Sequence, residues 1–359
     1  MALSAVGSQG YSGAVTSPAA TTAGIAAGSM NAIETAYVAA FREGFEQAYQ
    51  QTESKLQPYF ESETQASEYQ YFDRIGEAEA MAEVTSRLGD NPTSQILHDR
   101  RRIGLKDYEL GKYVDEKDLK RVVTDPMNAY TQALLASGKR KVDDIIIDKF
   151  FGTAETGKSG GTSIAFALAA SNVNDDLIYV GDKSKGTITT SGKYSVVAGN
   201  KEGFAVTENY VATGSSVSSG LTLDKLRAAR HTMLRLQAID QDEVINCFVG
   251  ARQLDDLLRI NEVINSDFSV RKNLAEGNVV SFMGFRFIHT ERLPVDDDGC
   301  RRVIVSLPKA LKMSTGEGLK GDMWRDPSKK NAPYIYYKMC AEASRMWGEV
   351  SGEIRCKEA

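Results

Sequence analysis

Apolar side chains recur at every fourth position near the start of the chain and predict a helix over residues 31–52 with one apolar face. Residues 1–30 are rich in alanine, serine, glycine and threonine and predict a flexible arm, because they lack the large apolar groups that build a core. Such a stripe ordinarily faces its own core. Docking on another subunit is the alternative, since a loose arm precedes it. The stripe consists of Ile33, Tyr37, Phe41, Phe45 and Tyr49.

Between residues 58 and 114 the chain is polar on both sides of Asp90-Asn91-Pro92, a strong turn signal that predicts an extended β-hairpin. Residues 61–90 hold eight acidic side chains against two arginines, and the returning arm begins with three arginines. A hairpin this polar has few apolar side chains to bury within its own chain, so we expect it to fold against a neighbouring molecule. A solvated flexible loop is the alternative. The arginines are expected to meet this acidic hairpin, or a neighbour's, rather than a nucleic acid. The candidate contacts between subunits are Tyr37, Phe41, Phe45, Glu77, Glu79, Glu83, Arg100, Arg101 and Arg102.

The clearest helical pattern ends near Phe151. Asp125 suits its N-cap and Pro126 its first turn, and apolar positions keep helical spacing for about 25 residues, or roughly 38 Å. After it, residues 160–220 are rich in glycine, serine, threonine and valine with short strand candidates. They predict a β-rich insertion with many turns.

The rest of the chain predicts mixed helices and strands. A helix begins near Thr222, and a buried strand over residues 243–250 leads into a helix over 251–260. A second pair of strands, 279–290 and 300–307, is joined through a turn, and the last forty residues are mostly strand. The turn contains Asp296-Asp297-Asp298-Gly299, which offers carboxylates to calcium but lacks the alternating ligands and closing glutamate of a calcium loop. We therefore interpret it as a turn.

Composition narrows the class of protein. A hydrophobic content of 42% and a charged content of 25% are typical of soluble globular chains, and a net charge of −5 gives no basis for binding nucleic acid by bulk charge. No run of 18 apolar residues predicts a membrane span, and the N-terminal segment lacks the features of a secretory signal. The four cysteines form no C-x-x-C pair and the three histidines are scattered, so we expect free buried thiols and no metal or histidine chemistry.

One stretch matches a catalytic motif. GTAETGKS, Gly152 to Ser159, fits the phosphate-loop pattern, in which Lys158 would reach phosphates and Ser159 would hold magnesium. That motif needs a buried strand before the loop and a helix after it. Here the end of a long helix precedes it, and Gly160-Gly161 follows, two residues that disfavour helix by about 1 kcal/mol each. We reject the phosphate loop and interpret the stretch as a polar connector after a helix, with Gly152 as the helix stop.

The order of these elements resembles the major capsid proteins of tailed bacteriophages over nearly the whole chain. DRRRIGLKDYELGKYVDEKDLKRVVTDP resembles the passage from the returning hairpin arm into the spine helix of that family. VINCFVGARQLDDLL resembles its strand-then-helix segment, VVSFMGFRFIHTERLP a later strand passage, and GEVSGEIRC the closing strand. Order and spacing together make the resemblance specific.

The resemblance implies an α+β capsid fold with an N-terminal arm, an extended β-hairpin loop, a peripheral domain with a long spine helix, and an axial α/β domain. The corresponding ranges are 1–57 for the arm, 58–114 for the hairpin, 115–159 with 307–359 for the peripheral domain, 160–220 for the β-rich insertion and 221–306 for the axial domain.

The same resemblance implies a structural protein and not an enzyme, without cofactors, that assembles with itself into pentamers and hexamers. The icosahedral shell would enclose double-stranded DNA without reading its sequence, in a virion assembled in the host cytoplasm. A separate scaffolding protein, a portal and a decoration protein are implied partners, and no membrane is involved. The alternatives are a phosphate-loop nucleotide hydrolase and another virion or encapsulin-like shell protein.

One departure from some relatives concerns covalent linkage. In those relatives a hairpin lysine forms an isopeptide bond with a neighbour's asparagine. Here no lysine occurs between Lys55 and Lys106. The shell is therefore expected to be held by charge and apolar packing.

Overall fold

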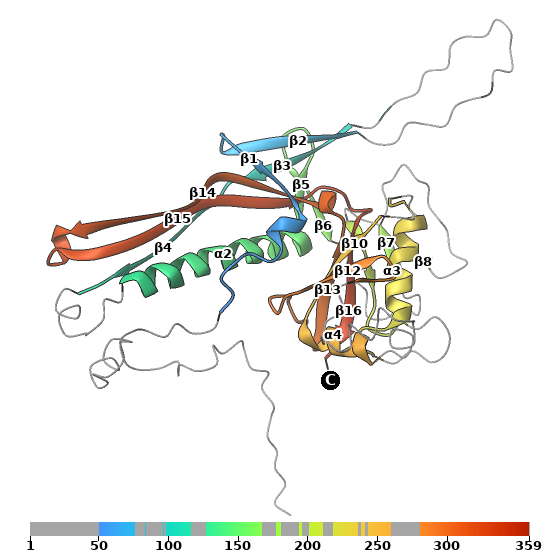
Figure 1. Cartoon of the computed structure of the whole chain (residues 1–359). Coiled ribbons are helices and arrows are strands. Elements are labelled where there is room, and N and C mark those ends of the chain that lie inside the picture. The colour runs from blue at the N-terminus through green and yellow to red at the C-terminus, as the bar shows by residue number, and fades with distance from the viewer. Residues whose placement is uncertain are drawn as a thin grey trace, which may run out of the picture.

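An elongated part and a compact part make up the protein, and one long helix runs along the elongated part to the compact one (Figure 1). The elongated part is a four-stranded sheet with the helix along it, and the compact part is built on a second, twelve-stranded sheet. The computed structural model describes residues 50–75, 83, 96, 98–115, 127–166, 177–180, 194–195, 201–210, 218–235, 238–240, 243–259 and 281–358.

The spine helix α2 (Met127–Phe151) confirms the clearest prediction from the sequence, with 25 residues that end where Gly152 follows. Ile145, Ile146 and Phe150 are almost completely buried and face the main core. Phe150 packs edge-on against Phe151, with ring centroids 5.3 Å apart. The proposed cap, Asp125, lies outside the described residues.

The elongated sheet has the order β1-β14-β15-β4. β14 and β15 are antiparallel strands of 16 and 14 residues that form one long hairpin, closed by the short helix η5 and by Lys330 and Asn331 in the left-handed conformation. A strand as long as β14 was not anticipated, because its three glycines and many charges weaken the strand pattern. The bounds are β1 (Glu61–Thr64), β14 (Leu311–Asp326), η5 (Pro327–Lys329), β15 (Ala332–Arg345) and β4 (Asp107–Tyr113).

The compact part centres on β10 (Ile245–Val249), all of whose residues are buried. β12 (Phe285–His289) pairs with one edge of β10 in parallel, and β13 (Cys300–Ser306) pairs antiparallel with the other. The two strands predicted as a pair are therefore separated by β10. Gly299 N donates to Asp296 O at 2.9 Å, which confirms the turn before β13. Further elements are α3 (Leu223–Arg235), α4 (Ala251–Leu258), β11 (Ser281–Phe282), β16 (Ser351–Lys357), η2 (Gln57–Tyr59) and η4 (Pro308–Ala310).

The closing strand β16 pairs with β13 over its whole length, from Ser306↔Ser351 to Cys300↔Lys357. It therefore belongs to the compact sheet and not to the elongated part with the rest of residues 307–359. On its other edge it pairs in parallel with β9 (Lys201–Val206). Gly352 lies opposite Phe204, and a Cβ at this position would come within 2.1 Å of the phenyl ring, so only glycine fits.

Residues 160–220 thus include part of the core. Phe204, Ala205 and Val206 of β9 are fully buried, because β16 and the main core cover them. From β9 the sheet continues through β6, β5 and β3 to β2, which links the compact part to the predicted hairpin. The remaining bounds are β5 (Ala154–Thr156), β6 (Thr162–Phe166), β7 (Leu177–Val180), β8 (Tyr194–Ser195), β2 (Tyr69–Ile75) and β3 (His98–Gly104).

Two predicted boundaries need correction. Gln50, Gln51 and Thr52 lie outside any helix, and the side chains of Gln50 and Gln51 form hydrogen bonds with Arg140 and Asp143 of α2. Residues 31–49 lie outside the described part of the chain. The hairpin is also shorter at its root than 58–114. Its two ends form β1 and β4, which pair with the long strands of the elongated sheet.

A buried carboxylate gives the fold an expected pH dependence. Burial raises the pKa of Glu353 in β16 to about 7, although Arg302 pairs with it at 2.5 Å. Because the folded protein then holds this proton between about pH 4.5 and 7 and the unfolded chain does not, stability falls as pH rises through this window. The loss amounts to at most about 3 kcal/mol. In Glu353→Gln, urea denaturation at a series of pH values should lack this fall, and an unchanged slope would contradict the assignment.

Candidate assembly surfaces

The hairpin root is held by a small core of its own. β2 and β3 pair antiparallel from Tyr69↔Gly104 to Ile75↔His98 and leave the body at the top of Figure 1. Phe72 and Ile103 pack with Met346, which follows β15. Arg74 lies over the ring of Trp347 at 5.0 Å. The described part of the hairpin is therefore fixed to the body of the same chain.

Below this root, three arginines share two carboxylates. Arg74, Arg101 and Arg345 each form an ion pair with Glu202 of β9, and Arg74 and Arg101 also pair with Asp99. The side chains of Arg101 and Arg345 are fully buried. Burial lowers the pKa of Arg101 to about 9 and that of Arg345 to about 10. We call these five residues the arginine cluster.

The arginine cluster also reaches the end of the spine helix. Arg345 donates to the carbonyl oxygens of Phe150 at 2.6 Å, Gly152 at 2.9 Å and Ile164 at 3.1 Å. The hairpin root, β9, β15 and α2 are thus tied to one polar centre.

The three arginines that were predicted to contact a neighbouring subunit therefore differ in burial and in partners. Arg101 is buried and its partners belong to its own chain, so it is no surface residue. Arg100 pairs with Asp73 of the same hairpin at 2.5 Å, and Arg102 pairs with Glu155. The alternation of side chains along a strand could have separated Arg101 from the other two. Glu83 is exposed, and the other predicted contacts, Tyr37, Phe41, Phe45, Glu77 and Glu79, lie outside the described residues.

The N-terminal segment is anchored on α2 by Asp143, a contact that the sequence did not predict. This carboxylate is completely buried and accepts hydrogen bonds from Gln51 Nε2 and Ser54 Oγ, both at 2.5 Å. It also accepts from the backbone N–H groups of Lys55 and Leu56, both at 3.1 Å. Next to them, the buried side chain of Leu56 enters the main core. Asp143 therefore fixes where the arm reaches the body.

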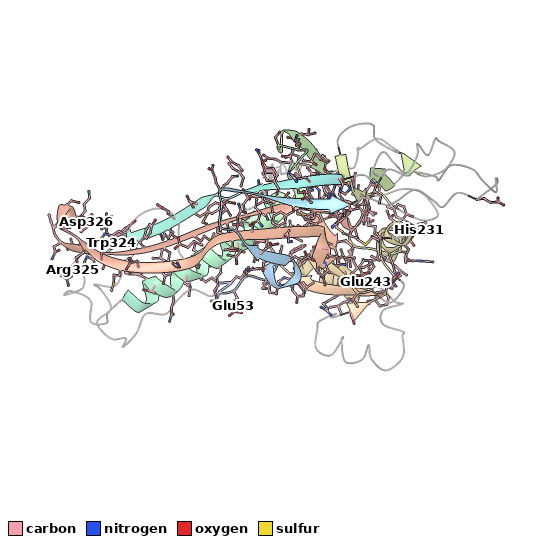
Figure 2. All side chains as sticks on the ribbon, turned by 90° about the horizontal axis from the view of Figure 1, so that it is seen from above. Glu53, His231, Glu243, Trp324, Arg325 and Asp326 are labelled. Atoms are coloured by element: carbon pink, nitrogen blue, oxygen red, sulfur yellow. The ribbon has the colours of Figure 1, made fainter. Side chains whose placement is uncertain are left out.

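An aromatic surface lies at the far end of the elongated sheet. The ring centroid of Tyr334 in β15 lies 4.3 Å from that of Tyr113 and 5.1 Å from that of Trp324. The ring centroids of Trp324 and Tyr336 are 5.4 Å apart. Trp324 and Tyr113 are 44% and 45% exposed. Figure 2 shows Trp324 at the end of the molecule opposite to His231 and Glu243.

The aromatic surface points away from α2. Lys112 is paired with Ile335 and lies over the ring of Tyr130 in α2 at 4.0 Å, so that face of the sheet meets the helix. Tyr113 and Tyr334 alternate with Lys112 and Ile335 and therefore face the other way. Among the described residues no helix covers this face, which suits it for contact with another molecule.

The rejected phosphate loop is a β-hairpin turn. β5 pairs antiparallel with β6, and Gly157 and Gly160 take positive φ values of 91° and 70° in the turn between them. Lys158 and Ser159 are exposed at its tip. No helix follows the motif, so the strand–loop–helix arrangement that binds phosphate is absent from this described segment.

Substituting Lys158 tests this interpretation. Lys158→Ala should leave both the melting temperature and particle assembly unchanged, because the side chain is exposed and makes no contact that the fold needs. Equilibrium dialysis with ATP should detect no binding to either protein. ATP binding that disappears in the variant would restore the hydrolase hypothesis.

The described part of the chain offers little support for a metal site, a reactive thiol or a membrane span. No group of three or more histidine, cysteine, aspartate or glutamate side chains is placed to hold a metal ion there. Asp296, a candidate calcium ligand, pairs with Arg355. Three of the four free cysteines, Cys247, Cys300 and Cys356, are buried. None of the described helices is long and apolar enough to cross a membrane.

The protein family and the solved structures that are similar to this chain are those of phage capsids. A family model described as "Phage capsid protein" matches residues 33–358. A search of curated proteins finds no significant match.

Solved capsid structures share the fold at low sequence identity. The capsid of cyanophage P-SCSP1u has a TM-score of 0.62 at 11% identity, covering 96% of this chain and 100% of that one. The mature capsid of bacteriophage PhiM1 has a TM-score of 0.59 at 14% identity, covering 88% and 90%. Mycobacterium phage Che8 has a TM-score of 0.59 at 12% identity, covering 88% and 95%.

Proposed function

Because the chain belongs to the phage capsid protein family, we propose that it is a major capsid protein whose copies form pentamers and hexamers and close an icosahedral shell around double-stranded DNA. The observation that carries this proposal is the family match over residues 33–358. The role is structural, its place is the virion, and its chief partner is a further copy of itself.

The architecture supports this proposal. The arginine cluster holds the root of the hairpin on the body of the chain, and Asp143 holds the root of the arm. The aromatic surface offers exposed Trp324 and Tyr113, residue types that are enriched where proteins meet. In a closed shell each of these features would contact an adjacent subunit.

Negative-stain electron microscopy of the expressed full-length chain tests the proposal. Closed particles, or rings with five-fold and six-fold symmetry, are the expected result. Discrete monomers under all assembly conditions, or rings of another symmetry, would reject it. The second of these outcomes would favour a portal or tail component.

The subunits are expected to be held without covalent links. The hairpin has no lysine between Lys55 and Lys106 to form an isopeptide bond with a neighbour. Mature particles boiled in detergent should therefore give one band at the mass of the monomer on a denaturing gel. A ladder of linked subunits would contradict this expectation.

A further inference from the structure

A polar cavity of about 250 Å³ lies at the hairpin root, where β3, β15 and the end of α2 meet. It is distinct from the arginine cluster, because Arg74, Arg101 and Glu202 do not line it. We call it the hairpin-root cavity. Its polar lining includes Tyr69, Arg102, Lys106, Lys149, Glu342 and Ser344.

One buried oxygen in this lining lacks a hydrogen bond among the described residues. Ser344 is 5% exposed, and its Oγ has no hydrogen-bond partner there. Unsatisfied buried polar groups are uncommon in folded proteins, because each costs about 1–3 kcal/mol. A polar group that enters the cavity would satisfy Ser344 directly.

The cavity also has an excess of positive charge. Arg102 is paired with Glu155, whereas Glu342 alone faces two ammonium groups, Lys106 Nζ at 3.1 Å and Lys149 Nζ at 3.3 Å. Glu342 raises the pKa of Lys106 by hydrogen bonding and charge. Three cations against two carboxylates leave room for one more negative charge. The lysine side chains are 59% and 30% exposed, so a ligand can reach them from solvent.

From this geometry we infer that the hairpin-root cavity receives an acidic side chain from the hairpin of a second copy of this chain. The inference rests on the proposed function and names the receptor for the hairpin. Charge selects the occupant, because residues 61–90 carry eight acidic side chains against two arginines. Some of these acids are already paired in their own chain, Asp73 with Arg100 and Glu63 with Lys312. Glu83, which lies farther along the hairpin, is exposed.

The hairpin of the same chain is poorly placed to fill its own cavity, because it starts there and runs away from it. Tyr69 lines the cavity, and β2 runs away from it to Ile75, six residues later. At about 3.4 Å per residue, the strand ends roughly 20 Å from the cavity. β2 therefore leads the chain away from its own cavity, whereas a neighbour's hairpin can approach from outside.

Photo-crosslinking in assembled particles tests the inference. A benzophenone amino acid replaces Lys106, and particles are assembled from a mixture of ¹⁴N-labelled and ¹⁵N-labelled chains. The expected crosslink joins position 106 to residues 77–90 in mixed heavy–light pairs, identified by mass spectrometry. Thr153, an exposed residue of the same lining, is the second attachment position if the first variant fails to assemble. Crosslinks within one copy only, or to other segments, would overturn the inference.

Substitutions give an independent measure. Lys106→Gln with Lys149→Gln should slow assembly by about tenfold, which corresponds to 1.4 kcal/mol. Lys320→Gln is the matched control, because this exposed lysine pairs with Glu317 away from the cavity, and it should assemble at the normal rate. Citrate that raises the melting temperature of free subunits, without hairpin crosslinks in particles, would identify a small-anion site and overturn the inference. Particles that form normally without the crosslink refute only this contact, whereas failure of the unmodified chain to form particles refutes the proposed function.

Discussion

Replacing Glu202 by glutamine is expected to lower the free energy of unfolding by about 3–5 kcal/mol, because it leaves buried arginines without their shared carboxylate. Arg101 and Arg345 are fully buried and both pair with Glu202. With the charge removed, Asp99 would remain as the ion-pair partner of Arg74 and Arg101, and Arg345 would lose its ion pair with Glu202. Urea denaturation of the unassembled subunit measures the change.

The control for this substitution is Glu317→Gln. Glu317 also pairs with two cations, Lys320 at 2.8 Å and Lys338 at 3.1 Å, but the three side chains are at the surface. Water screens such pairs, so the urea midpoint should barely move. Equal effects of the two substitutions would contradict a special role for the arginine cluster.

Hydrogen exchange gives the Glu202→Gln experiment a second readout. The hairpin root depends on the arginine cluster through Arg74 of β2 and Arg101 of β3. Amides of these strands should therefore lose protection before those of β10 in the compact core. Uniform loss of protection across the chain would mean that Glu202 stabilises the whole fold and does not act mainly at the hairpin root.

The sequence predicted those elements whose signals are local. α2 has continuous helical spacing, and β10 followed by α4 shows a buried strand that gives way to a helix. β9 was harder to predict, because its burial depends on β16 at the other end of the chain. A strand of mixed composition looks like part of an insertion until its sheet neighbour is known.

The polar contacts were predictable only in part. The basic run from Arg100 to Arg102 marked a real charge centre, and alternation along β3 indicates that its middle member faces the other side. The partner of Arg101 could not be inferred, since Glu202 lies 101 positions later. Asp143 gave no signal at all, because Lys55 precedes it by 88 positions and offers only a backbone N–H group.

The largest expected effect on the N-terminal segment comes from Asp143→Ala. The substitution removes the acceptor for two side-chain donors and two backbone N–H groups, from Gln51, Ser54, Lys55 and Leu56. Hydrogen bonds to a charged group contribute about 1.5–3 kcal/mol each, and buried donors left without an acceptor cost more. We expect a loss of at least about 3 kcal/mol in the free energy of unfolding.

Hydrogen exchange distinguishes detachment of this segment from general destabilisation. The amides of Lys55 and Leu56 bond directly to Asp143, so in Asp143→Ala they should exchange like exposed amides while those of β10 stay protected. Asp148→Ala is the matched control, since Asp148 is an exposed aspartate five residues further along α2. If the arm reaches a neighbouring subunit, particles should also fail to form from Asp143→Ala, although its compact core remains folded. Protected Lys55 and Leu56 amides in that variant would show that other contacts hold the arm in place.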